Sequence, residues 1–204
     1  MPSALIEVPA EPAVSGPRRK RWTRAECAKL DASGLLEQQH LELVEGELID
    51  KMGKNRPHVF ALALMSIWLR RVFGEAFVHQ ESPIDVSPED NPSNEPEPDL
   101  VVLNRDIWHF RAANPGPSDL RLVVEAADTT LRFDLTTKAR LYARAGIIEY
   151  WVLDVSGRRL IVHREPQFGK YAAVLNYNDQ ESVAPLTAPH AMFQAAIALP
   201  ESGR

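Results

Sequence analysis

The chain has 204 residues, of which 45% are hydrophobic, and carries a net charge of −5 from 23 Lys and Arg against 28 Asp and Glu. This length and composition predict a soluble protein with one domain and a full hydrophobic core. The acidic balance excludes a protein whose whole surface is basic, so any contact with nucleic acid must use a local patch.

The cysteine count and the apolar runs bear on the compartment. Cys27 is the single cysteine, which excludes an intrachain disulfide and fits a reducing environment, so we expect a cytoplasmic protein. No apolar run approaches the roughly 20 residues of a membrane span, and none resembles the core of a signal peptide. We therefore expect no membrane association.

Residues 1–21 are predicted to be a mobile N-terminal arm and residues 22–204 a single domain. The arm is rich in proline, alanine and serine and lacks a periodic apolar face. Its basic end, Arg18 to Arg21, either contacts a phosphate backbone or is a solvated tail, and the sequence leaves both open. After it, Thr23 and Glu26 form a capping-box pattern that predicts a short helix through Asp31.

A hairpin and a long helix follow. From Leu41 to Met52, apolar residues around Glu45-Gly46-Glu47 predict a β-hairpin with a glycine turn. Apolar residues then recur at helical spacing up to Gly74 and predict an amphipathic helix that covers one face of a sheet. The predicted stripe consists of Phe60, Leu64, Ile67, Trp68, Arg71 and Val72.

The second half of the chain is predicted to alternate between strands and loops, with one helix. Strands are expected at 77–86, 100–103, 122–126, 149–154, 160–164 and 171–177, and a helix at 134–145 with Asp134 as its N-cap and Gly146 as its left-handed end. Residues 87–98 form an acidic, proline-rich loop. The loop at 104–119 carries Trp108 and Phe110, which either pack on the domain or face a partner.

Two of these strands each carry one carboxylate. The runs at 100–103 and 122–126 are apolar on both faces, which is typical of strands covered on both sides. Asp99 precedes the first run and Glu125 interrupts the second, so antiparallel pairing would make the two acids neighbours. A buried carboxylate needs compensation, and Glu125 is therefore either in a structural salt bridge or part of a site. With no His or Cys at ligand spacing, the pair suits Mg²⁺ or Mn²⁺ better than zinc.

Three further residues are candidates for the same site. Lys138 lies on the inward border of the predicted helix and could orient a water and offset charge on a phosphate, although a surface pair with Asp134 is compatible with this position too. Glu45 is either a further acid of the site or a surface residue of the hairpin. His58 either contacts substrate or caps the long helix.

In order and spacing, these motifs resemble the PD-(D/E)XK restriction-endonuclease-like superfamily and, more closely, its Uma-two family of bacterial endonucleases. In the superfamily the lysine normally follows the glutamate by two residues, where this chain has Ala127. In the Uma-two branch the lysine has moved to the following helix, which makes Lys138 its counterpart. The resemblance covers roughly residues 22 to 190 and rests on Glu45-Gly46-Glu47, His58, Pro98-Asp99, Val124-Glu125, Asp134-x-x-x-Lys138 and Glu149-Tyr150-Trp151.

The resemblance implies an α/β fold with a central mixed β-sheet flanked by helices, and a homodimer. It further implies that Asp99 and Glu125 hold the metal, that Lys138 positions the attacking water and that Glu45 supports the metal shell. Our hypothesis from the sequence is thus a Mg²⁺- or Mn²⁺-dependent endonuclease that hydrolyses phosphodiester bonds of DNA. Two alternatives stay open: a nuclease-like fold that only binds nucleic acid or protein, and a metal-free glycosidase that uses the carboxylate pair.

Overall fold

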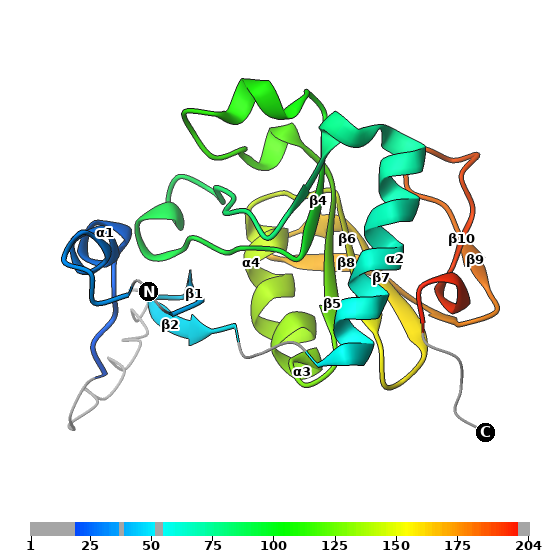
Figure 1. Ribbon diagram of the computed structural model, residues 1–204, viewed down its shortest axis with the longest axis horizontal. Coiled ribbons are helices and arrows are strands. Elements are labelled where there is room, and N and C mark those ends of the chain that lie inside the picture. Colours follow the sequence, from blue (N-terminus) through cyan, green and yellow to red (C-terminus); the bar gives the residue numbers. More distant parts are fainter. Residues whose placement is uncertain (1–18, 37–38, 52–54, 200–204) are drawn as a thin grey trace, which may run out of the picture.

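The fold is organised around a six-stranded sheet with strand order β3-β4-β5-β6-β7-β8. The computed structural model describes residues 19–36, 39–51 and 55–199 (Figure 1). The strands of this sheet are β3 (Val78–Gln80), β4 (Leu100–Leu103), β5 (Leu120–Ala127), β6 (Glu149–Asp154), β7 (Arg159–Gln167) and β8 (Lys170–Asn178). β5 and β6 pair in parallel and the other neighbours pair antiparallel, so the predicted mixed sheet is confirmed.

Helices cover both faces of the sheet, which explains why the central strands are apolar throughout. Helix α2 (Arg56–Phe73) lies on one face, and a continuous helical segment lies on the other (Figure 1). That segment consists of α3 (Leu131–Phe133), the π-helical turn η5 (Asp134–Lys138) and α4 (Ala139–Arg144). Along β5 the side chains alternate: Val124 packs in the cluster beneath α2, and Val123 packs in the cluster beneath α4.

The long helix is confirmed, and its predicted apolar face is correct for Leu64 and Trp68, which pack against the core, but wrong for two other members. Phe60 and Ile67 are 50% and 53% exposed. The buried side chains are those of Ala61, Leu62, Met65, Ser66 and Leu69. Two of these positions hold the small residues Ala61 and Ser66, which a pattern weighted by large apolar residues misses. Trp68 packs at the border of this face, against the rings of Trp151 and Phe193.

A separate hairpin and a short helix precede α2. Helix α1 (Arg24–Ala32) begins with the predicted capping box of Thr23 and Glu26. Strands β1 (Leu41–Val44) and β2 (Glu47–Asp50) form the predicted hairpin, and Gly46 adopts a φ of 72° in its tight turn. The predicted end of the hairpin, Met52, lies outside the described residues.

The described end of the predicted N-terminal arm contacts the hairpin and α1. Lys20 forms an ion pair with Glu26. The guanidinium of Arg21 donates to the carbonyl oxygen of Glu45 and forms an ion pair with Glu47. Lys20 and Arg21, although exposed, thus make polar contacts with the domain. Residues 1–18 of the predicted arm lie outside the described residues.

Two predicted boundaries are corrected. The strand expected at 77–86 is limited to β3, since Glu81 has a φ of 49° and Pro83 has no N–H to donate to a ladder. The helix expected from Asp134 begins at Leu131, so Asp134 is no N-cap but a buried residue inside the helix, where it accepts a hydrogen bond from the Thr130 hydroxyl at 2.6 Å. The left-handed end at Gly146 is confirmed by its φ of 77°.

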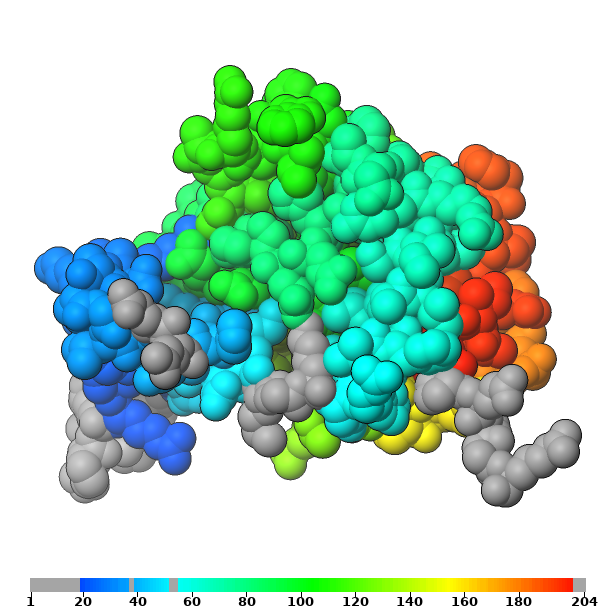
Figure 2. Space-filling model, in the orientation of Figure 1, coloured from blue at the N-terminus to red at the C-terminus, as the bar shows by residue number. Residues whose placement is uncertain are grey.

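Short elements complete the chain. Strands β9 (Ser182–Val183) and β10 (Phe193–Gln194) form a small C-terminal sheet, which lies beside α2 on the same face of the molecule (Figure 2). In the loop at 104–119, Trp108 is 73% exposed, whereas Phe110 packs against the core. The 3-10 turns are η1 (Glu75–Phe77), η2 (Asn91–Ser93), η3 (Ile107–Phe110), η4 (Pro117–Asp119) and η6 (Ala195–Ile197). No helix among the described residues has the length and hydropathy to cross a membrane.

Candidate active site

The pairing of β4 with β5 brings Asp99 and Glu125 together. Leu100 lies opposite Val124 in an antiparallel register, so the residue before β4 and the residue after Val124 are adjacent. The backbone N–H of Asp99 donates to Glu125 Oε2 at 3.3 Å, and the N–H of Ala126 donates to Asp99 Oδ2 at 2.8 Å. Both side chains are buried. Asp99 and Glu125 are therefore neighbours, as the antiparallel pairing predicts.

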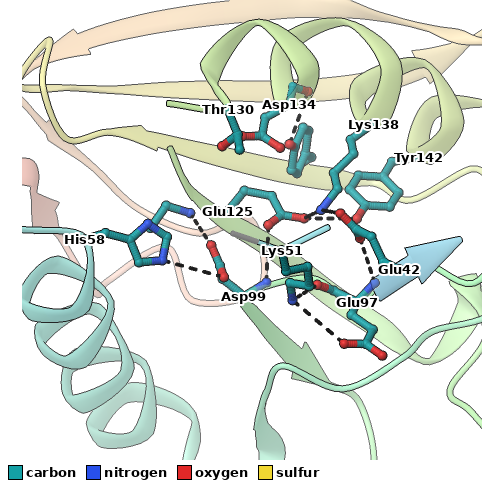
Figure 3. A network of polar contacts seen from close by, with 12 residues as sticks. Glu42, Lys51, His58, Glu97, Asp99, Glu125, Thr130, Asp134, Lys138 and Tyr142 are labelled. Atoms are coloured by element: carbon teal, nitrogen blue, oxygen red, sulfur yellow. Dashed lines mark hydrogen bonds and ion pairs between the residues drawn. The ribbon is translucent and has the colours of Figure 1, made fainter. Parts of the chain in front are cut away.

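The helix over this end of the sheet supplies a cation to the pair (Figure 3). Lys138 Nζ lies 2.8 Å from Glu125 Oε1 and 2.9 Å from Glu42 Oε1. One turn later, the Tyr142 hydroxyl donates to the same Glu125 oxygen at 3.1 Å. Because residues four apart share a helix face, both side chains point down onto Glu125. Lys138, expected at the border of the inward face, is fully within it.

The acid that the hairpin contributes is Glu42, which the sequence interpretation missed. Besides contacting Lys138, its Oε2 accepts from the Glu97 N–H at 3.1 Å. Glu45, the predicted acid, is placed elsewhere: at the hairpin turn it pairs with Arg144 at 2.5 Å and does not line the pocket. A carboxylate inside an apolar run, the signal that singled out Glu125, was also present in Leu41-Glu42-Leu43-Val44.

The side chains of Glu42, Asp99, Glu125 and Lys138 line a cavity of about 150 Å³ between the hairpin, the start of α2, the end of β5 and α3. Its described lining includes six carboxylates and two lysines, so the pocket carries an excess of negative charge. The carboxylates are those of Glu42, Asp50, Asp99, Glu125, Asp128 and Asp134, and the lysines are Lys51 and Lys138. A cation is the ligand that such an excess attracts.

His58 enters the pocket from the first turn of α2. Its Nε2 lies 3.9 Å from Asp99 Oδ1 (Figure 3). The helix cap is provided by Asn55, whose side-chain oxygen accepts from the His58 N–H at 3.0 Å. The N-cap of α2 is therefore Asn55 and not His58, which leaves contact with a substrate as the other role expected for His58. The Asn55 side-chain amide also donates to Asp128 across the rim of the pocket.

The electrostatics of the cluster follow from its burial. Burial raises the pKa of Glu125 to about 8, with Lys138 opposing the shift and the neighbouring carboxylates adding to it. Burial likewise raises the pKa of Asp134 to about 6 against the opposing effects of Lys138 and Thr130. For Lys138, burial lowers the pKa, but the surrounding carboxylates outweigh burial and the net pKa is raised. Lys138 therefore stays cationic.

The donor set fits a hard divalent cation. Asp99 and Glu125 offer carboxylate oxygens only, and Mg²⁺ is usually held by one or two carboxylates together with waters and substrate phosphates. Among residues 19–36, 39–51 and 55–199, no group of three or more His, Cys, Asp or Glu is arranged to hold a metal ion by itself. A metal on Asp99 and Glu125 thus stays a prediction, and it requires water or substrate oxygens to complete the shell.

Comparison with known proteins identifies the family. Residues 26–198 match the family Uma2, whose description is "Putative restriction endonuclease". A crystal structure described as "a putative nuclease belonging to DUF820 from Anabaena variabilis ATCC 29413" is similar with a TM-score of 0.60 and 14% identity, covering 78% of this chain and 88% of that one. At this identity the likeness concerns the fold. No significant match was found among curated proteins. Because the family match spans most of the chain and all residues of the buried cluster, this protein belongs to the Uma2 family.

Proposed function

We propose that this protein is a Mg²⁺- or Mn²⁺-dependent endonuclease that hydrolyses phosphodiester bonds of DNA. One observation carries the proposal: Asp99 and Glu125 lie side by side in a pocket, with the Lys138 ammonium 2.8 Å from Glu125. The membership of the Uma2 family, described as "Putative restriction endonuclease", supports it. Metal-assisted hydrolysis of a phosphate ester needs ligands for the cation and groups that orient the reactants, and two carboxylates and one lysine can supply them.

In this mechanism Asp99 and Glu125 would hold the cation. When bound, the cation would acidify a water and stabilise the charge that develops on the phosphate oxygens. The chain orients Glu125 for this task, because its carboxylate accepts hydrogen bonds from the Asp99 N–H, Lys138 and Tyr142. Lys138 carries a permanent positive charge at the same point, where it positions the attacking water and favours negative charge on the phosphate.

We assign to Glu42 the supporting role that the resemblance gave to Glu45. Glu42 holds the second side of the Lys138 ammonium at 2.9 Å and is itself fixed by the Glu97 N–H. Removal of Glu42 would leave the lysine free to turn toward Glu125 alone, whereas removal of Glu45 would break only an ion pair at the hairpin turn.

A binding module without catalysis is the second candidate. The observation that favours it is the double pairing of Lys138, since a buried lysine held between two carboxylates also occurs as a purely structural ion cluster. Under this hypothesis the charged cluster holds the hairpin, through Glu42, against the π-helical turn η5, which carries Lys138. Substitution of Glu42, Glu125 or Lys138 would then change stability, and neither the wild type nor the variants would hydrolyse nucleic acid.

Cleavage of single-stranded circular DNA and of supercoiled plasmid in Mg²⁺ tests the proposal. We expect Asp99→Asn and Glu125→Gln to abolish cleavage of whichever substrate the wild type cuts. Glu149→Gln is the matched control. Glu149 is also buried and paired with a basic residue, Arg164, but it lies at the start of β6 and outside the pocket. Full activity in Asp99→Asn and Glu125→Gln would refute the assignment, and loss in all three variants would point to folding.

A further inference from the structure

Strand β8 (Lys170–Asn178) is a free edge of the central sheet. The strand order places β8 and β3 at the two edges, and β8 is nine residues long whereas β3 has three. Beyond its pairing with β7, no backbone hydrogen bond joins residues 170–177 to another part of the described chain. In an antiparallel edge strand, every other residue directs its N–H and C=O groups away from the neighbouring strand. The outer side of β8 can therefore pair with a further strand.

The sequence of β8 lacks the features that normally block pairing at an edge. Natural edge strands are short, bulged, interrupted by proline or rich in charged side chains, above all lysine. Residues 171–177, Tyr-Ala-Ala-Val-Leu-Asn-Tyr, contain no proline and no charged residue. Val174 and Leu175, in the middle of this run, are 55% and 40% exposed. The other edge is protected, because Glu81, with its φ of 49°, and Pro83 end β3 after three residues.

The exposed apolar surface continues from this edge onto the face of the sheet beneath α4. Val174 lines a groove of about 280 Å³ whose other apolar residues come from η5, α4, β7 and β8. They are Leu135, Ala139, Ile161 and Tyr171. A strand added along β8 would cover the Val174 side of this groove. Its association would therefore bury apolar surface in addition to forming backbone hydrogen bonds.

The charges around β8 match a second β8 that runs antiparallel to the first. Lys170 begins the strand, and the turn after the strand carries the acids Asp179 and Glu181. When the nine residues pair antiparallel with their own copy, Val174 is at the centre. Lys170 then lies opposite Asn178 of the second copy, beside these two acids. The basic end of each strand thus meets the acidic end of the other, which is the self-complementarity that a two-fold contact requires.

From the free edge, its unprotected sequence and its self-complementary charge, we propose that a second copy of this chain pairs antiparallel with β8 about a two-fold axis at Val174. The central sheets of the two copies then form one continuous sheet. The proposal is independent of the proposed function, because no residue of β8 belongs to the described lining of the pocket that holds Asp99 and Glu125. It names the contact surface and the residue at its centre, neither of which the sequence resemblance supplies.

Disulfide formation across the axis tests the proposed register. In a Cys27→Ser background, Val174→Cys places one thiol of each copy at the axis. Cβ atoms of directly opposed residues lie about 4.5–5.5 Å apart, close to the span of a disulfide. We expect oxidation at micromolar protein to give disulfide-linked dimers as the main product. Ala172→Cys is the matched control, because Ala172 is an exposed residue of the same strand whose two copies would lie about 14 Å apart along it.

A mixture of two variants sharpens this experiment. In the proposed register Ala172 lies opposite Asn176 of the second copy. Chains with Ala172→Cys and chains with Asn176→Cys should therefore form a mixed disulfide, while neither variant links to itself. Absence of linked dimers from Val174→Cys, or equal linkage in Ala172→Cys alone, overturns the proposal.

The oligomeric state of the unlinked protein provides a second test. Light scattering should give twice the 22.8 kDa chain mass for the wild type. Val174→Lys sets two like charges against each other at the axis and should weaken dimerisation at least roughly tenfold, with an unchanged circular dichroism spectrum. Ile67→Lys alters a comparably exposed apolar residue on α2, at 53%, and should leave the dimer intact. A monomeric wild type, full dimerisation of Val174→Lys, or an equal loss in Ile67→Lys overturns the proposal.

Discussion

Exchange of Lys138 for methionine tests whether the buried cluster is a balanced set of charges. In the wild type the Lys138 ammonium lies within 2.9 Å of both Glu42 and Glu125, and all three side chains are buried. Methionine keeps the length and apolar stem of the side chain but leaves two buried carboxylates without their cation. Loss of one partner from a buried ion pair costs about 3–5 kcal/mol, so we expect Lys138→Met to lose that amount at neutral pH.

The stability that Lys138→Met loses should increase as the pH rises. Without Lys138 the neighbouring carboxylates have pKa values further above those of the unfolded chain, and a carboxyl group with a raised pKa stabilises the fold only while it is protonated. The deficit should therefore be small near pH 4.5, the ordinary value for glutamate, and should grow as the pH rises toward 8. Urea denaturation of both proteins in EDTA across this range measures it.

Two additions sharpen the experiment. Lys51→Met is the comparison, because Lys51 is a pocket lysine that donates to the Glu97 carbonyl oxygen at 2.7 Å and lies 3.9 Å from the Glu97 carboxylate, so it should lose a smaller amount, about 1.5–3 kcal/mol. Mg²⁺ should restore part of the stability of Lys138→Met, by about 2.7 kcal/mol at a hundredfold excess over the dissociation constant. If Lys138→Met were as stable as the wild type at every pH, Lys138 would not be the counter-charge of the cluster.

Three further predictions concern other parts of the molecule. Burial lowers the pKa of His163 from 6.5 to about 4, so between these values the unfolded chain binds more protons than the folded one. Stability that is present above pH 6.5 is therefore lost as the pH falls toward 4, by about 3 kcal/mol. His163→Gln should remove this loss in acid denaturation curves. Met65→Ala should cost about 2–5 kcal/mol and Ile67→Ala less than about 0.5 kcal/mol in urea denaturation, and the reverse order would contradict the buried face of α2. The dimer implied by the sequence resemblance should appear as twice the 22.8 kDa chain mass in light scattering, and a monomer at all concentrations would rule it out.

The central strands and the carboxylate pair could be predicted because their signals are local. Leu100–Leu103 and Leu122–Ala126 are unbroken apolar runs, and such runs form strands that are covered on both faces. Antiparallel pairing of two short strands then fixes which of their ends meet, so the proximity of Asp99 and Glu125 followed without knowledge of the rest of the fold.

The features that could not be predicted from the sequence depend on the surroundings of each segment in the folded chain. Glu42 joins the cluster only because the hairpin docks against the loop before β4, where Leu43 and Glu95 exchange backbone hydrogen bonds. The buried face of α2 includes the small residues Ala61 and Ser66, which contribute little to a pattern weighted by large apolar residues. The start of the helix at Leu131 was missed because Asp134, a residue type common at N-caps, is instead buried inside the helical segment.

Calorimetric titration of Mn²⁺ measures directly whether Asp99 and Glu125 bind a metal. We expect the wild type and Glu149→Gln to bind the cation alike, and Glu125→Gln to lose this binding while it keeps its fold by circular dichroism. Binding of equal strength in Glu125→Gln, or no binding in the wild type, would contradict the claim that Asp99 and Glu125 form a metal site.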